Sequence, residues 1–256
     1  SVIDTAGTTV VISDASAENP IFIFPENATQ DSINYVLELV AFSTEGCSDT
    51  TRQVVTVYPQ PLVTFSGITD GCGPLGLLLV NGSRPKNGED STSMTFRWLI
   101  DSAIDGTIED SFTTVNLDNQ YTNGSQTDVP YSVTLVGTTQ HGCVEEETQS
   151  LVVFPDPVSE LNVDTVRGCA GLTIGSSVLS AIDYPDAVDT FVWFIDSTGS
   201  GFELWYTSIT PDIDTLTDTL FNDGDTVLVR LETRNEHGCA VASDTAVFIT
   251  YPDPVA

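Results

Sequence analysis

The 256-residue chain carries 37 acidic against 7 basic side chains, a formal net charge of −30 at pH 7. Such a chain cannot neutralise phosphate groups, so nucleic acid is excluded as a partner and a bare anionic membrane surface is disfavoured. Hydrophobic residues at 40% still suffice for packed cores, and no run of about 20 apolar residues predicts a membrane span.

In chain order, period-two apolar patterns of β-branched and aromatic residues predict strands over 35–39, before Tyr58, over 96–101 and 131–135, before Phe154, over 191–196 and 227–231, and before Tyr251. Turn signals such as Asn81-Gly82 and Asn123-Gly124 separate these runs. Helical periodicity is lacking, and about seven short strands in about 95 residues are typical of a β-sandwich. The sequence therefore predicts an all-β fold.

The pattern repeats along the chain. The tetrapeptides Thr44–Cys47, Gln140–Cys143 and Glu236–Cys239 end 96 residues apart (143 − 47 and 239 − 143). Each is followed by a strand pattern that ends in an aromatic residue and Pro-x-Pro. Upstream, Gly71-Cys72 matches Gly168-Cys169 and Trp98 matches Trp193. Agreement among these signals predicts a tandem array.

Three units follow from this spacing. Residues 1–58 are expected to be the back part of a unit whose front is missing, and both ends of the chain are interpreted as cuts from a longer protein. Residues 62–154 and 158–251 are expected to be complete units, with Pro-x-Pro linkers at 59–61, 155–157 and 252–254. Because Pro-x-Pro favours polyproline II, we expect short, semi-rigid joints and an extended rod.

The order Cys, Trp, Cys resembles immunoglobulin-type packing, in which a buried Trp lies beside a bridged cysteine pair. This resemblance implies the bridges Cys72–Cys143 and Cys169–Cys239, with Cys47 bonded to a residue outside the chain. The alternative, Cys47–Cys72 with Cys143–Cys169, would join neighbouring units and stays open. Either pattern predicts an oxidising, extracellular location.

Three segments carry a further resemblance to PKD-like domains: Tyr131–Leu135, Gly142-Cys143 and Val153-Phe154-Pro155. Of that family's Trp-Asp-Phe-Gly-Asp-Gly segment, only Trp98 with Asp101 and Trp193 with Asp196 remain, so the units resemble the divergent PKD-like repeats. Arrays of this kind resemble those of giant Bacteroidota surface proteins, including gliding-motility adhesins and other type IX secretion cargo.

A tripeptide of Asp, Ser or Thr, and an apolar residue or Thr resembles the O-glycosylation motif of that phylum. The resemblance implies sugar attachment at some of these residues: Thr5, Ser32, Thr50, Ser91, Ser102, Thr165, Ser197, Thr215, Thr219, Thr226 and Thr245. Asn27-Ala28-Thr29, Asn81-Gly82-Ser83 and Asn123-Gly124-Ser125 also match the N-glycosylation sequon, although the last two are also Asn-Gly turns.

Catalytic chemistry is not expected. The only two histidines, His141 and His237, stand at equivalent repeat positions and are interpreted as turn residues, so no nucleophile, base and orienting acid can be assembled. Oxygen ligands suited to Ca²⁺ cluster at four residues: Asp212, Asp214, Asp223 and Asp225. Solvated acidic turns explain the same residues, and no other cofactor is indicated.

Three functions fit these observations. The first is a structural stalk of a bacterial surface adhesin or filament, with neighbouring repeats of the same chain as partners. The second is an accessory module that binds extracellular glycans or surfaces for a secreted hydrolase. The third is a filament or surface-layer subunit that associates with itself. A repeated length favours the stalk, because selection for reach produces it.

Overall fold

The computed structural model describes residues 2–3, 10–86, 91–157, 159, 165–169, 190–209, 224–243, 245–252 and 254. Apart from the short 3-10 turn η1 (Ser91–Ser93), every element in these ranges is a β-strand. Within the same residues no helix has the length and apolarity that crossing a membrane requires. The all-β prediction is confirmed.

The chain forms two compact units. The first comprises residues 1–68, 77–119 and 131–150, and the second comprises 69–76, 120–130 and 151–256. This division runs through the predicted middle repeat, because the segments around 71–76, 120–130 and 151–154 contact the following residues. The limits 62–154 and 158–251 therefore stay a prediction.

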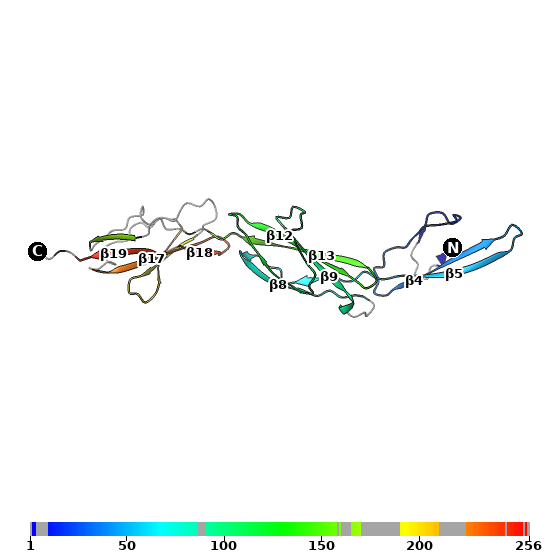
Figure 1. Cartoon of the computed structure of the whole chain (residues 1–256), viewed down its shortest axis with the longest axis horizontal. Helices are drawn as coiled ribbons and strands as arrows, with labels where there is room; N and C mark the ends of the chain where they lie inside the picture. Colours follow the sequence, from blue (N-terminus) through cyan, green and yellow to red (C-terminus); the bar gives the residue numbers. More distant parts are fainter. Residues whose placement is uncertain are drawn as a thin grey trace. The chain divides into compact units, whose positions relative to one another are not determined.

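The N-terminal part of the first unit contains a long hairpin of β4 (Ile33–Phe42) and β5 (Ser48–Val57), visible in Figure 1. β1 (Val2–Ile3) adds antiparallel to β4, while β2 (Val11–Ile12) and β3 (Phe22–Ile23) form a separate small hairpin.

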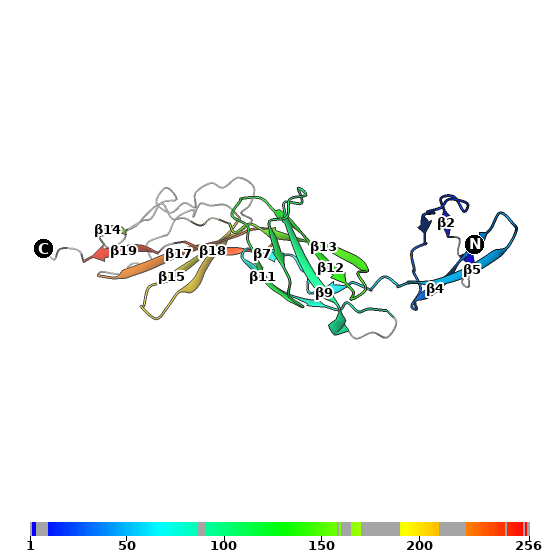
Figure 2. The same ribbon diagram turned by 45° about the vertical axis from the view of Figure 1, so that its right-hand side comes forward.

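The middle of the chain forms two facing sheets (Figure 2). The larger has the order β10-β9-β12-β13-β7, with β10 at Asp110–Phe112, β9 at Thr95–Ser102, β12 at Val129–Thr138, β13 at Val144–Phe154 and β7 at Gly71–Cys72. The smaller has the order β11-β8-β6, at Leu117–Tyr121, Leu75–Asn81 and Phe65–Ser66. β7 pairs parallel with the end of β13, so Cys72 lies beside Phe154, the last residue of the final strand.

Trp98 of β9 is the centre of this core and is fully buried. Its ring meets the Phe65 ring of the opposite sheet edge to face, with centroids 5.1 Å apart. Its indole N–H donates to the carbonyl oxygen of Thr114 at 3.0 Å, which satisfies the buried polar group.

The second unit contains the sheet of the order β14-β19-β17-β15-β16, with β18 also paired to β17. The bounds are Thr165–Cys169 for β14, Ala246–Tyr251 for β19, Thr226–Arg234 for β17, Thr190–Asp196 for β15, Glu203–Ser208 for β16 and Ala240–Ala242 for β18. Trp193 of β15 is 0% exposed, as Trp98 is, although among the described residues its indole N–H has no hydrogen-bond partner. The predicted core role of both tryptophans is confirmed.

The β4–β5 hairpin differs from its repeat equivalent in one respect. Leu39 stands 96 residues before Leu135, yet Leu39 is 65% exposed and Leu135 is 0% exposed. Phe42, at the end of β4, is 75% exposed. Among the described residues, this apolar face of β4–β5 therefore has no covering sheet like that over β12–β13.

Candidate functional site

One five-residue turn closes three hairpins, and we call it the cysteine turn: Ser43–Cys47, Thr139–Cys143 and Asn235–Cys239. In the last of these, the Asn235 N–H donates to the Cys239 carbonyl at 3.1 Å and the Gly238 N–H donates to the Asn235 carbonyl at 3.0 Å. The Asn235 side-chain oxygen accepts from the Cys239 N–H at 2.9 Å. The first residue of each turn thus fixes the backbone of the cysteine that ends it.

The glycine before each cysteine has a left-handed backbone. Gly238 has φ of +83°, and Gly46 and Gly142 have +84° and +82°. A side chain is unfavourable in this region, which explains why Gly precedes Cys in all three copies. The shared geometry places all three cysteines at the same point of their hairpins.

The disulfide joins Cys72 to Cys239, which are 167 residues apart in sequence with Cα atoms at 5.5 Å. The predicted bridges Cys72–Cys143 and Cys169–Cys239 are therefore wrong. The alternative pairs are not formed either, because Cys47, Cys143 and Cys169 are free thiols. The disulfide does join two predicted repeats, but its cysteine pair occurs in neither of the two predicted sets of bridges.

The reason lies in strand geometry. Cys143 directly precedes β13, whereas Cys72 pairs with Phe154, the last residue of that strand. Eleven residues of strand span about 35 Å, and a disulfide requires Cα atoms within about 7 Å. Cys169 pairs with Tyr251, twelve residues after Cys239, so the same argument excludes that pair.

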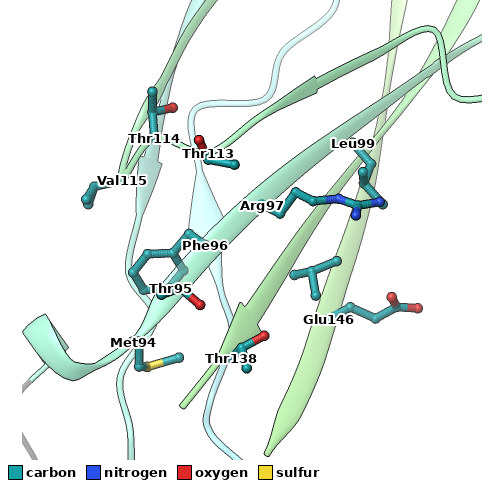
Figure 3. Close-up of a pocket in the computed structure, with 11 residues that line it drawn as sticks. Met94, Thr95, Phe96, Arg97, Leu99, Thr113, Thr114, Val115, Thr138 and Glu146 are labelled. Atoms are coloured by element: carbon teal, nitrogen blue, oxygen red, sulfur yellow. The ribbon is translucent and has the colours of Figure 1, made fainter. Parts of the chain in front are cut away.

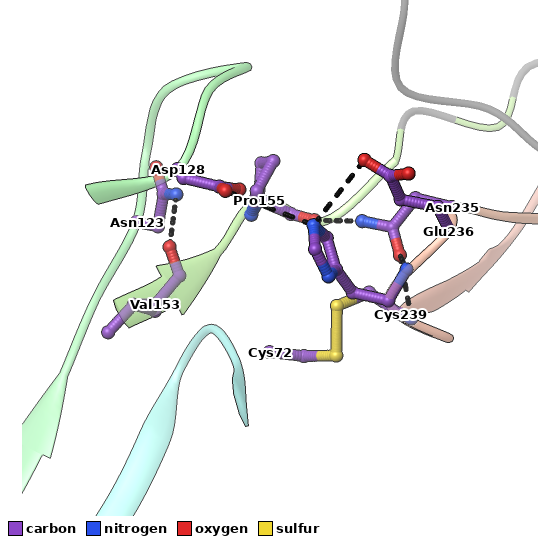
Figure 4. Close-up of a disulfide and its surroundings, with 9 residues drawn as sticks. Cys72, Asn123, Asp128, Val153, Pro155, Asn235, Glu236 and Cys239 are labelled. Atoms are coloured by element: carbon purple, nitrogen blue, oxygen red, sulfur yellow. Dashed lines mark hydrogen bonds and ion pairs between the residues drawn. A yellow bond between two sulfur atoms is a disulfide. The ribbon is translucent and has the colours of Figure 1, made fainter. Parts of the chain in front are cut away.

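The turn that carries Cys239 packs against the end of β13 (Figure 4). The His237 ring lies flat on the Phe154 ring, with centroids 3.7 Å apart and an interplanar angle of 1°. The Asn235 side-chain N–H donates to the Pro155 carbonyl at 2.9 Å. His237 Nε2 also lies 3.8 Å from an Asp128 carboxylate oxygen and 3.7 Å from one of Glu236. We call this contact the second joint.

The first unit contains an equivalent contact, the first joint, 96 residues earlier. His141 stacks on Tyr58 with centroids 3.6 Å apart and planes 5° apart. The Cys143 thiol lies 3.9 Å from the Tyr58 carbonyl oxygen. Both histidines lie in turns as the sequence predicted, but the sequence reasoning missed their aromatic partners. The signal was present, since Tyr58 and Phe154 are spaced like His141 and His237.

Both joints enclose their linkers. Pro59 and Pro61 are buried in the first unit, and Pro155 and Pro157 are buried in the second. A proline ring has no rotamer freedom to lose, so its burial costs little conformational entropy. The Pro-x-Pro segments are therefore packed parts of the joints.

An asparagine fixes the strand end at each joint. The Asn123 side-chain N–H groups donate to the carbonyls of Val153 and Thr127, each at 2.8 Å, and its oxygen accepts from the Ser125 N–H. Asn27 makes the same contacts with Val57, Asp31 and Thr29, and is only 2% exposed. These two sequon matches are therefore structural, and their 96-residue spacing was the available signal.

Of the predicted calcium ligands, Asp212, Asp214 and Asp223 lie outside the described residues. Asp225 is described: its N–H donates to the Thr250 hydroxyl oxygen at 3.0 Å, and its carbonyl oxygen accepts from the Thr250 N–H at 3.0 Å.

A different acidic group, Asp101, Asp105 and Glu109, has carboxylate oxygens within 4.8 Å of one another. Asp101 accepts from the N–H groups of Asp105 and Gly106, so it organises the β9–β10 turn. Asp196 accepts from three N–H groups of the β15–β16 turn in the same way. Because both aspartates accept hydrogen bonds from the backbone of the turn that follows, an Asp stands three residues after each core Trp.

The predicted O-glycosylation residues differ in accessibility. Thr50, Ser197, Thr226 and Thr245 are exposed, and Ser32 and Ser102 are half-buried. The side chains of the remaining five lie outside the described residues: Thr5, Ser91, Thr165, Thr215 and Thr219.

Open grooves occur in the first unit, and a small one of about 340 Å³ has Glu26, Lys86 and Glu145 in its lining. Two others are larger. One, of about 800 Å³, runs beside β9 and includes Phe96, Arg97 and Glu146 (Figure 3). The other, of about 680 Å³, lies between the β2–β3 hairpin and the apolar face of β4, with Phe22, Leu37 and Phe42 in its lining. Neither of these two linings includes a histidine or cysteine, and the second includes the acidic residues Glu18 and Glu38.

No family model matches the chain, and no curated protein matches it. Among solved structures, the chain resembles the FN1–FN3 domains of chicken CNTN1, at 11% identity and a TM-score of 0.40, covering 86% of this chain and 78% of that one. A multi-domain segment of titin matches at 12% identity and a TM-score of 0.37, covering 96% and 84%. SGBP-B of the Bacteroides ovatus mixed-linkage glucan utilization locus, in complex with a mixed-linkage heptasaccharide, matches at 13% identity and 0.29, covering 74% and 47%. The likeness concerns the β-sandwich fold alone.

Proposed function

We propose that this chain is a non-catalytic spacer of an extracellular bacterial surface protein or filament, of the kind to which PKD-like arrays of Bacteroidota adhesins belong. Its repeats determine the separation between other, adhesive parts of the molecule. The cysteine turns of the second and third repeats each contact the strand end of the repeat before them.

The observation that carries this proposal is the recurrence of the joint. The ring stack, the buried prolines and the asparagine at the strand end occur twice, 96 residues apart. A binding or catalytic site needs to be built only once, whereas a spacer needs the same contact at every boundary. The net charge of −30 supports the same role, since it keeps neighbouring chains apart in solution.

The disulfide supports an oxidising location outside the cytoplasm. The exposed Thr50, Ser197, Thr226 and Thr245 stay candidate attachment sites for sugars.

Small-angle X-ray scattering at two salt concentrations tests the spacer role. A flexible polyanion contracts when its charges are screened between about 20 mM and about 500 mM salt, whereas repeats joined by packed contacts keep their maximum dimension. We expect no change beyond experimental error. Double substitution of His141 and His237 by Ala should make the dimension salt-dependent, and substitution of the exposed Val144 by Ala is the control.

Contraction of the unmodified chain with salt would contradict the spacer role. Saturable binding of a purified polysaccharide by this chain would instead favour the accessory binding module.

A further inference from the structure

The edge formed by Cys169 and Tyr251 repeats the edge that carries the disulfide. In the second joint, β7 pairs parallel with β13, with Gly71 opposite Val153 and Cys72 opposite Phe154. At the end of the third repeat, β14 pairs parallel with β19, with Gly168 opposite Thr250 and Cys169 opposite Tyr251. Cysteine and aromatic ring therefore have the same strand order, direction and register at both places.

The first of these edges is occupied, whereas the second is exposed in the part of the chain that the structure describes. Cys72 is bonded to Cys239, and Phe154 is covered by His237. Cys169 is an exposed free thiol, and Tyr251 is 48% exposed. A tyrosine in this position can make the ring contact, because Tyr58 makes it with His141 in the first joint.

We propose that the Cys169–Tyr251 edge binds the cysteine turn of a further repeat joined through Pro252-Asp253-Pro254, and that Cys169 forms a disulfide with the cysteine of that turn. The two thiols lose two protons and two electrons to a disulfide oxidant, which is reduced to thiols as the new S–S bond forms. The proposal rests on the repeated register and not on the spacer function.

A partner on the same chain is favoured by the observed joint. There the linker itself takes part, since the Asn235 side chain donates to the Pro155 carbonyl and Pro155 and Pro157 are buried. Pro252-Asp253-Pro254 follows Tyr251 as Pro155-Asp156-Pro157 follows Phe154. The turn of a second chain would arrive without this linker.

The test extends the full chain by a copy of residues 160–256 placed after Ala256. Val255 and Ala256 then replace Val158 and Ser159, so the copied Cys239 follows Cys169 by the same 167 residues that separate Cys72 from Cys239. A second extension carries residues 64–154 instead, whose turn ends in Cys143. Non-reducing peptide mapping after alkylation identifies the bonds, and the retained Cys72–Cys239 bond is the internal control for folding.

We expect Cys169 to be bonded to the copied turn cysteine in monomers of both extended chains. In the matched variant with that copied cysteine changed to Ser, Cys169 should become fully alkylated. A Cys169 that stays alkylated in both extensions while Cys72–Cys239 forms would overturn the proposal. Covalent dimers through Cys169 would overturn it as well, because the partner would then be a second chain.

Discussion

The side-chain amide of Asn235 donates a hydrogen bond of 2.9 Å to the carbonyl oxygen of Pro155, which lies 80 residues earlier in the chain. The same side chain accepts from the N–H groups of His237 and Cys239. One buried amide thus fixes both the shape of the cysteine turn and its contact with the linker.

Replacing Asn235 by Ala should destabilise the second unit by about 1–3 kcal/mol, because buried backbone groups lose their partners. Asn235→Thr should cost less, since Thr139 in the equivalent turn still accepts from the Cys143 N–H. Urea unfolding followed by Trp fluorescence measures both. Equal losses for the two variants would show that the turn contact, which Thr keeps, contributes nothing.

Asn123 predicts a second loss of stability. Its side chain donates to Val153 and Thr127, so Asn123→Ala should cost about 1–3 kcal/mol. The control is Asn81→Ala, because Asn81 also stands in an Asn-Gly-Ser sequence but accepts from Ser83 within its own turn. We expect the control to cost clearly less. A comparable cost at both positions would contradict the assigned role of Asn123.

The disulfide predicts an asymmetry among cysteine variants. Cys72→Ser or Cys239→Ser should lower stability by about 2–5 kcal/mol, because the bond constrains the unfolded chain. Cys143→Ser and Cys169→Ser should change it little, since both thiols are free in this structure. Thermal unfolding with and without reductant measures the difference. If reduction leaves the midpoint of unfolding unchanged, the bond does not constrain the chain as described.

Asp101 predicts a local effect in the β9–β10 turn. It is 8% exposed and accepts from the N–H groups of Asp105 and Gly106, while Ala103 and Ile104 between them have φ of 64° and 52°. Asp101→Ala should cost about 1–3 kcal/mol and speed amide exchange in that turn. Asp110→Ala, at an exposed position of β10, is the control. Unchanged exchange at Gly106 would exclude this role.

The same turn has a predicted pH dependence. Hydrogen bonds from the backbone and then the side chain of Thr107 lower the pKa of Asp105 below its ordinary value. Because the folded-state pKa is depressed, the stabilisation is present above the unfolded-state pKa and is lost as pH falls through the folded-state value. Carboxyl NMR titration should show Asp105 titrating lower than in Thr107→Ala. Identical titration in the two proteins would contradict the prediction.

The sequence predicted much of the fold and little of the joint. Period-two patterns with 96-residue spacing predicted the hairpins whose turns end in Cys47, Cys143 and Cys239, because strand and turn preferences are local. The disulfide was missed because spacing does not say at which end of a sandwich a cysteine lies. That depended on the parallel pairing of Cys72 with Phe154, a contact between strands far apart in sequence.

The structural role of Asn27 and Asn123 could not be predicted from the sequon match either. A three-residue motif cannot distinguish a glycan acceptor from an amide buried against a strand end, and burial is decided by residues about 30 positions away. A comparison of the two repeats could have indicated this role, because Val57 follows Asn27 at the same spacing as Val153 follows Asn123.

The bond between Cys72 and Cys239 also has a mechanical consequence. When the chain is pulled from its ends, tension passes through the two sulfur atoms and bypasses the segment between the cysteines, which are 167 residues apart in sequence. At about 3.3–3.6 Å per residue, roughly 550–600 Å of contour length stays unavailable to stretching until the bond is reduced. Oxidation thus shields most of the second and third predicted repeats from force, and reduction of the bond lets the chain extend further.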